Sequence, residues 1–146
     1  MKFLNTIEKE VDRVVIITGG SRGIGEACAY KFASKGDVVI VNYLKDSNSA
    51  KIVEAEIEKL DGECVLYRAD VSNSIEVKEM VEKVVSTYGK IDVLINNAGI
   101  SGYISFSEIT EKDWENVMKI NLDSCFLCSK YVLPQMVNQK GERVIN

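Results

Sequence analysis

The stretch "RVVIITGGSRGIG", residues 13–25, decides how this chain folds. Its first half is a run of Val and Ile with little alternation, which is typical of a strand buried on both faces of a parallel sheet. Its second half, "TGGSRGIG" (18–25), places Gly19, Gly23 and Gly25 at the spacing G-x-x-x-G-x-G. Such a turn between a strand and a helix lets backbone N–H groups approach a phosphate group, which the helix N-terminus then stabilises.

Four similar β-rich runs follow, separated by longer amphipathic stretches. Strands are expected at residues 13–18, 37–42, 63–68, 91–96 and 143–146. Helical periodicity predicts a first buried stripe of Ile24, Ala27, Cys28 and Phe32, a second of Ala50, Val53, Ile57 and Leu60, and a third of Val77, Met80, Val81, Val84 and Tyr88. Left-handed caps are expected at Gly36, Gly62, Gly89 and Gly141. Asn73 with Glu76 predicts an N-terminal cap for the third helix.

Strict alternation of strands and helices with short connections predicts a parallel sheet with right-handed crossovers. We therefore expect an α/β fold, a doubly wound, Rossmann-like sheet between two helical layers, with strand order 3-2-1-4-5. Residues 1–146 are expected to form a single dinucleotide-binding domain. The ligand crevice of such a sheet opens where the strand order reverses, so "TGGSRGIG" and the "NNAG" of residues 96–99 should meet there.

The composition excludes several classes of protein. Hydrophobic residues make up 46% and charged residues 27% of 146 residues, which is ordinary for a globular domain. A net charge of −4 without a basic patch gives no indication of nucleic-acid binding. No apolar run approaches the roughly 20 residues that span a bilayer, and residues 1–13 do not resemble a signal peptide. We expect a cytoplasmic protein without a membrane partner.

The chain contains no histidine, which removes Ser-His and Cys-His nucleophiles and His-rich metal sites, and no metal site is expected. Cys125 and Cys128 form a C-x-x-C, a spacing shared with redox and zinc motifs. The pair lies in the middle of a helical pattern, away from the helix N-terminus that would stabilise a thiolate. We therefore expect these cysteines to serve core or interface packing.

A single long helix is expected from Glu111 to Lys140. Its apolar residues, from Trp114 to Met136, occupy more than one stripe, so something besides the sheet should cover them. A homo-oligomer formed through this helix is the expected cover. Pro134, the only proline, should kink or loosen the helix.

Four motifs then point to one family. "TGGSRGIG", "ADV" (69–71), "NNAG" (96–99) and "KINL" (119–122) occur in the order and at the spacing of the short-chain dehydrogenase/reductases. From Val14 onward the chain resembles this family, and it is most similar to the subgroup that contains 3-oxoacyl-[acyl-carrier-protein] reductases.

The resemblance implies a role for each matching residue. Ser21, Arg22 and Ile24 would contact the phosphates and the adenosine ribose, and Asp70 and Val71 would hold the adenine. Asn97, Ala98 and Gly99 would line the floor beneath the ribose on the nicotinamide side. Asn121 would be the asparagine of the family's catalytic tetrad, which organises a proton-relay water; a buried polar residue that bridges helix and sheet is the structural alternative.

The end of the second strand bears on which dinucleotide binds. NAD sites usually place an acid about 20 residues after the glycine loop, where it accepts bonds from the ribose 2′-OH. Here the strand ends with Asn42 and Tyr43, and the first acid is Asp46, which reads as loop. Arg22, with Lys45 as a second candidate, would supply cations. The pattern favours NADP(H), with NAD(H) as the alternative.

The family's chemistry also needs a Tyr-x-x-x-Lys pair and an upstream Ser, which the resemblance places beyond the fifth strand. None of the six tyrosines is followed by Lys at the fourth position. The first interpretation is that the chain is the N-terminal part of an NADP(H)-dependent ketoreductase, truncated after the fifth strand and inactive alone, whose substrate would be a small molecule or an acyl thioester. The others are a non-catalytic dinucleotide-binding sensor or interaction module, and an unrelated doubly wound binder.

Overall fold

The computed structural model describes residues 13–139 and 141–146. A five-stranded parallel sheet has the order β3-β2-β1-β4-β5, which confirms the predicted topology. The strands are β1 (Val14–Ile17), β2 (Val38–Tyr43), β3 (Glu63–Arg68), β4 (Val93–Ile95) and β5 (Arg143–Ile145). The helices are α1 (Gly23–Ala33), α2 (Ser47–Glu58), α3 (Ser74–Tyr88), α4 (Glu111–Met118) and α5 (Ser124–Val137), and a π-helical segment, η1 (Lys119–Asp123), joins α4 to α5.

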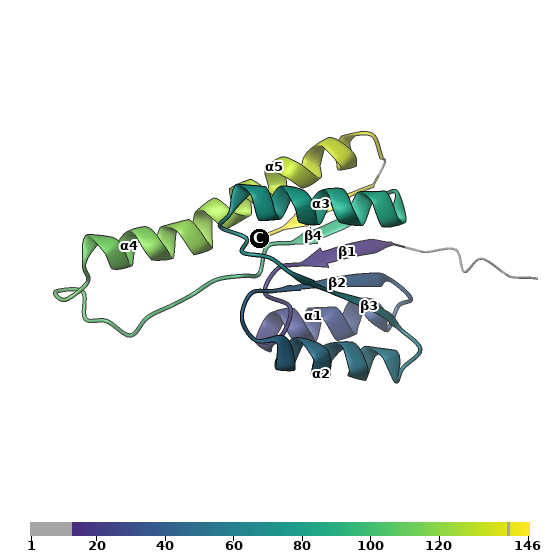
Figure 1. Cartoon of the computed structure of the whole chain (residues 1–146), viewed down its shortest axis with the longest axis horizontal. Helices are drawn as coiled ribbons and strands as arrows, with labels where there is room; N and C mark the ends of the chain where they lie inside the picture. The colour runs from purple at the N-terminus through teal and green to yellow at the C-terminus, as the bar shows by residue number, and fades with distance from the viewer. Residues whose placement is uncertain (1–12, 140) are drawn as a thin grey trace, which may run out of the picture.

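Two helical layers enclose the sheet (Figure 1): α1 and α2 cover one face, and α3 and α5 cover the other. The alternation of the buried strands shows how both faces are filled. Val14 and Ile16 of β1 point into the core beneath α3 and α5, whereas Val15 and Ile17 point toward α1 and α2. All four are fully buried, as expected for a central parallel strand.

Helix α1 does not bury the predicted stripe. Its buried residues are Gly25, Ala29 and Ala33, while Ile24 is 78% exposed and Phe32 is only half-buried. Small side chains spaced four residues apart let the helix lie close to the sheet, and this close approach displaces the larger residues to the flanks. A pattern based on hydrophobicity alone selects the larger residues, so this prediction was wrong.

Of the four predicted left-handed caps, Gly89 is confirmed as the C-cap of α3, with φ +74°. Gly36 and Gly141 have positive φ, but they follow the right-handed C-caps Ser34 and Asn138 of α1 and α5 and are not caps themselves. After α2 the left-handed residue is Asp61 instead of Gly62. Gly62 is required for space, because a Cβ there would lie 2.6 Å from the Ile57 Cγ2. The second stripe is buried at Ala50, Val53 and Ile57, but Leu60 lies beyond the end of α2 and is 72% exposed.

Helix α3 matches its prediction in both face and cap. Val77, Met80, Val81 and Val84 are buried against the sheet, and Tyr88 packs at the edge of the same cluster. The Asn73 side chain accepts hydrogen bonds from the backbone N–H groups of Ile75 and Glu76. An Asn cap of this kind satisfies donors that the helix leaves without partners.

The long helix expected over residues 111–140 is divided into α4, η1 and α5, and its last residue, Lys140, lies outside the described residues. The change of hydrogen bonding occurs at η1, far from Pro134, and α5 continues past that proline to Val137. Residues 1–12, on which the signal-peptide prediction mainly rests, also lie outside the described part. Across residues 13–139 and 141–146, no helix has the length and apolarity required to cross a bilayer.

Residues 100–123 form an arm that extends away from the sheet and consists of a loop, α4 and η1 (Figure 1). Helix α4 has no buried residue. Large apolar side chains of the arm are exposed, and they include Tyr103, Phe106 (90%) and Trp114 (60%). On α5, one face packs in the core while Phe126 and Val137 are exposed on the other. Helix α3 lies beside α5, where the Ser74 and Tyr131 hydroxyls are 2.7 Å apart.

Candidate functional site

A cavity of about 550 Å³ lies at the carboxyl edge of the sheet. It is lined by Gly19, Ser21, Arg22, Asn42, Tyr43, Leu44, Lys45, Asp46, Ala69, Asp70, Val71, Asn97, Ala98, Gly99, Ile100 and Ile120. All of these residues except Ile120, which lies in η1, are at or after the carboxyl ends of β1, β2, β3 and β4, so the motifs that are separated in the sequence meet where the strand order reverses. Four predicted site residues do not line the cavity: Gly23, Ile24, Gly25 and Asn121.

The glycines of the first loop act in two different ways. Gly25 permits close packing, because a Cβ there would lie 2.5 Å from the Asn97 Nδ2 and 2.5 Å from the Gly19 carbonyl oxygen. Gly19 has φ +60° and lies against Ala98, where a Cβ would be 3.0 Å from the Cα. Gly23 has φ +59°, but a Cβ added there would meet no atom within 4 Å, so its backbone faces open space. The loop is therefore closely packed at Gly19 and Gly25, and its backbone is exposed at Gly23 between them.

Thr18 and Asn97 join the first loop to the segment after β4. The Asn97 side chain donates hydrogen bonds of 3.0 Å to the carbonyl oxygens of both Thr18 and Gly19. In return, the Thr18 hydroxyl accepts from the backbone N–H groups of Asn97 and Ala98, at 3.0 and 2.9 Å. Thr18 is 2% exposed, so these bonds are shielded from water. They hold two walls of the cavity in one register.

Asn42 joins the first loop to the strand ends on the other side. Its side-chain oxygen accepts from the Gly19 N–H at 3.3 Å, and its amide nitrogen donates to the carbonyl oxygens of Tyr67 and Ala69. The residue is 2% exposed. The polar atoms of the Asn42 side chain are thus all bonded to backbone groups. The cavity wall continues from Asn42 with the segment from Tyr43 to Asp46.

The start of α1 differs from the starts of the next three helices. Asp46, Asn73 and Thr110 cap α2, α3 and α4 with side-chain hydrogen bonds, whereas Arg22 at the start of α1 makes none. The first N–H groups of a helix have no partners within the helix, and together with the helix dipole they attract anions. The backbone at Gly23, which has open space above it, lies at this same position.

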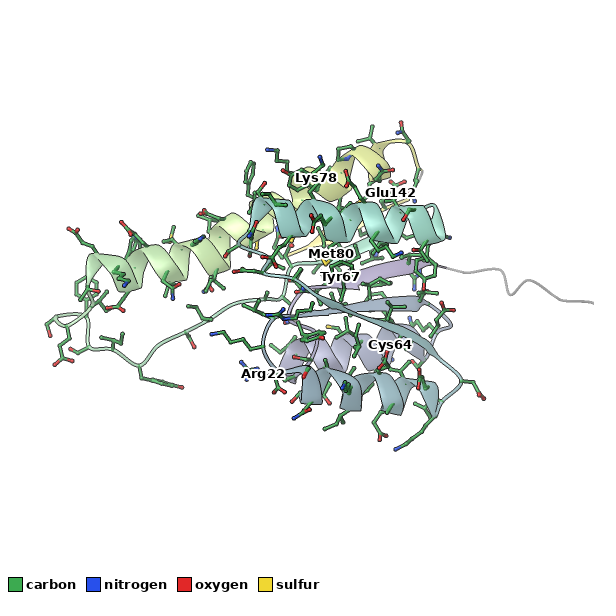
Figure 2. All side chains as sticks on the ribbon, viewed as in Figure 1. Arg22, Cys64, Tyr67, Lys78, Met80 and Glu142 are labelled. Carbon is green, nitrogen blue, oxygen red and sulfur yellow. The ribbon has the colours of Figure 1, made fainter. Side chains whose placement is uncertain are left out.

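Three charged side chains line the adjacent end of the cavity: Arg22, Lys45 and Asp46. Figure 2 shows Arg22 beside the ends of α1 and α2 where these two helices begin. Among the described residues, no carboxylate lies within ion-pair distance of the Arg22 guanidinium. Hydrogen bonds from the Ser49 backbone N–H and hydroxyl, with a smaller effect of the Arg22 charge, hold the pKa of the Asp46 carboxyl below its usual value.

The "ADV" segment forms the wall that follows β3. Val71 is 7% exposed and contributes apolar surface, and the half-buried Asp70 adds a polar edge. The Asp70 N–H donates to the Glu76 carboxylate at 2.7 Å, and one Asp70 carboxylate oxygen accepts from the Ser72 N–H and hydroxyl. A tight turn between β3 and α3 therefore fixes both residues.

Asn121 lies in η1 and binds backbone instead of facing the cavity. Its side-chain oxygen accepts from the Ile100 N–H at 2.7 Å, and its amide nitrogen donates to the Ile100 carbonyl oxygen at 2.8 Å. Asn121 also lies directly against Gly99. Because Gly99 and Ile100 line the cavity, Asn121 positions this edge of it. These two bonds also join the first residue of the arm to η1 at its other end.

Sequence reasoning left three parts of the site without a role. Thr18 was only the first letter of the glycine motif, although a hydroxyl at the end of a buried strand is a signal for a loop-to-loop bond. Asp46 was assigned to the loop, although its position before "SNS" matches a helix cap. Ile120 gave no signal, because its place on the cavity wall depends on the path of the arm.

The cysteines lie away from the cavity wall. Cys128 is fully buried in the core, as expected, and burial raises the pKa of its thiol to about 12. Cys125 is half-buried and donates to the Asn121 carbonyl oxygen. Within the described part of the chain, no group of three or more His, Cys, Asp or Glu side chains is placed to hold a metal ion.

The sheet order and the cavity at its reversal point define a Rossmann-like α/β domain. The family model for short chain dehydrogenase matches residues 13–146. The chain belongs to the short-chain dehydrogenase family.

Curated relatives lie in one group of reductases. The chain is 40% identical over 134 residues to a 3-oxoacyl-[acyl-carrier-protein] reductase of Synechocystis sp., covering 92% of this chain and 54% of the relative. It is 38% identical over 134 residues to the 3-oxoacyl-[acyl-carrier-protein] reductase FabG of Thermotoga maritima, with the same coverage of 92% and 54%. The chain thus spans about half the length of the curated relatives it matches.

Solved structures agree with this assignment. A metagenomic short-chain oxidoreductase in complex with NADP is 31% identical with a TM-score of 0.88, and the match covers 93% of this chain and 62% of the other. A short-chain dehydrogenase from Burkholderia cenocepacia in complex with NADP is 31% identical with a TM-score of 0.84, covering 90% and 53%. The predicted family and fold are therefore confirmed.

Proposed function

We propose that this chain is the cofactor-binding part of an NADP(H)-dependent ketoreductase. The reaction would transfer hydride between the nicotinamide and a ketone or alcohol such as a 3-oxoacyl thioester. The observation that carries the proposal is that α1 begins without a side-chain cap, next to a cavity lined by Arg22 and Lys45. At Gly23 the backbone faces open space, so a ligand can approach it. The reductases of Synechocystis and Thermotoga support the substrate class, and the NADP complexes of the neighbours support the cofactor.

The residues present fit such a nucleotide. The free N–H groups at Gly23 to Gly25 would hold the pyrophosphate, because a helix N-terminus favours negative charge. Asp70 and Val71 would border the adenine, and the segment from Asn97 to Gly99 would support the ribose on the nicotinamide side. Bound NADP(H) would supply the hydride.

A 2′-phosphate would lie at the end of the cavity formed by Arg22 and the segment after β2. The guanidinium forms no direct ion pair among the described residues, so its N–H groups can bond to a ligand. The side chain that replaces the usual strand-end acid, Asn42, is neutral and bonded to backbone. These two features favour NADP(H) over NAD(H).

Titration calorimetry tests this preference. NADPH should bind at least tenfold more tightly than NADH, since a charge-assisted bond to phosphate contributes about 1.5–3 kcal/mol. Arg22→Ala should remove most of the difference, whereas Lys51→Ala, which removes an exposed cation of α2 outside the cavity, should not. Trp114 lies on the arm and does not line the cavity, so the fluorescence of the bound nucleotide is a better optical signal than quenching of Trp114. Equal affinities for the two nucleotides would contradict the assignment.

A further inference from the structure

Asp46 places a carboxylate on the wall of the cavity. It lines the cavity together with Arg22 and Lys45, at the end where the segment after β2 meets the start of α1. It lies three residues after the end of β2, beyond the strand-end position that Asn42 occupies. The side chain is not free to turn away from this position, because it caps α2.

The cap fixes both carboxylate oxygens. One accepts from the Ser49 backbone N–H at 2.9 Å, and the other accepts from the Ser49 hydroxyl at 2.7 Å. Both oxygens of Asp46 are therefore already hydrogen-bonded to α2, so the carboxylate acts on a ligand in the cavity through its charge. A negative charge acts over several ångströms without contact, and it opposes the two cations beside it.

Resting on the proposed function, we propose that Asp46 is a specificity-determining residue of this cavity. Its carboxylate offsets the charge of Arg22 and Lys45 and weakens the binding of a 2′-phosphate, so that discrimination against NAD(H) is smaller than the two cations alone would give. The residue has two separable properties: a cap, which Asn can replace, and a charge, which Asn removes.

The test compares adenosine 2′,5′-bisphosphate with AMP as calorimetric probes of the unmodified chain and of Asp46→Asn. The variant should bind the bisphosphate about threefold to tenfold more tightly, as expected for one partly screened charge, and its affinity for AMP should change less than about twofold. The gain should shrink at about 0.5 M salt, because screening weakens the charge effect but leaves a structural role unchanged.

A matched control exists on the arm. Asp113 is the acidic member of the α4 capping box: its carboxylate accepts from the backbone N–H of the cap residue, Thr110, and it does not line the cavity. Asp113→Asn changes the net charge equally and should leave both affinities unchanged. Thermal unfolding followed by circular dichroism checks that both variants fold. If Asp46→Asn does not fold, the test is repeated with Asp46→Ser, which also retains a cap.

The outcomes separate the two proposals. Unchanged affinity for the bisphosphate in the Asp46 variants would overturn the role of Asp46 and leave the proposed function intact. Weaker binding of AMP by Asp46→Asn would also overturn it, because Asp46 would then be an acceptor for the ribose 2′-OH. If the unmodified chain binds neither probe and NADPH does not bind either, the proposed function fails, and the role of Asp46 fails with it.

Discussion

The cavity and the arm both begin at the carboxyl edge of the same sheet, but they use their residues in opposite ways. In the cavity walls, Thr18 and Asn42 are 2% exposed, and each bonds to segments that follow other strands. In the arm, Phe106 is 90% exposed and α4 has no buried residue. The Asn121 side chain bonds to the backbone of Ile100, which joins the two ends of the arm. The difference shows that the cavity side of the domain is supported within the described chain, whereas the arm presents apolar surface that the described residues do not cover.

The largest expected effect concerns turnover. Under the proposed function, Asn121 is the one residue of the family's catalytic tetrad that residues 1–146 are expected to supply, and none of the tyrosines is followed by Lys at the fourth position. Without a positioned general acid the rate should fall by a factor of about 10²–10⁴, and poor substrate orientation should lower it further. We expect no measurable NADPH consumption with a 3-oxoacyl thioester, followed by nicotinamide absorbance. The full-length Synechocystis relative is the positive control, and steady turnover that is lost in Asn121→Ala would break the comparison.

The next effect concerns the packed end of the glycine loop. Gly25→Ala places a Cβ against backbone and the Asn97 amide, which cannot move without breaking the bonds between the two loops. We expect it to lower the free energy of unfolding by about 2–3 kcal/mol, as for overpacking of a rigid core, and to abolish nucleotide binding. Gly23→Ala has open space and should cost only about 1 kcal/mol, through its positive φ. Urea unfolding measures the free energy of unfolding of both variants. An equal decrease in the two would show that the loops are not packed as described.

Part of this contrast could be predicted from the sequence. Runs of Val and Ile, glycine turns and the Asn73 cap are local signals, and they defined the strands, the helix α3 and the strand order. The buried face of α1 was missed because it depends on small residues, Ala29 and Ala33, that pack close to the sheet. The division of residues 111–140 was missed because a π-helical segment depends on what η1 contacts, here the backbone of Ile100.

The site was predicted to a similar extent. The motifs identified most of the cavity walls, since loops that follow parallel strands meet at one edge. The function of Asn42 as a backbone connector could not be inferred from the sequence, because it depends on the direction of its side chain after folding. The cap at Asp46 had a signal in the sequence, but the place of this residue on the cavity wall did not.

Two asparagines sharpen the comparison further. Asn97 and Asn121 each bond to backbone through their side chains, but the first lies between the cavity walls and the second on the exposed arm. Asn97→Ala should destabilise the chain by about 1–3 kcal/mol, because it leaves buried carbonyl groups without donors. Asn121→Ala should cost less than about 1 kcal/mol, because water can replace its bonds. Thermal unfolding measures both, and a larger loss for Asn121 would mean that the arm is part of the stable core.

The smallest effect concerns self-association. We propose that the exposed apolar face of the arm and α5 supports a homo-oligomer, since surfaces of this kind recruit partners. Phe126, which is 62% exposed, should be part of that contact, and Phe126→Lys should weaken association about tenfold, equivalent to roughly 1.4 kcal/mol. Ile52→Lys, on the outer surface of α2 at 59% exposure, is the control and should have no effect. Sedimentation across a concentration series measures both, and a monomer at all concentrations would count against the oligomer.

The most direct test of the central claim is to observe the backbone amides of the chain while NADPH is added. In a ¹⁵N-labelled sample, we expect the largest shifts of amide resonances at Gly23, Ile24 and Gly25, where α1 begins without a side-chain cap. The amides of α4 should remain nearly unchanged, because the start of that helix is already capped by Thr110 and Asp113 and the helix does not line the cavity. Shifts confined to α4, or no shift at Gly23 to Gly25 at saturating NADPH, would contradict the assignment of this cavity as the cofactor site.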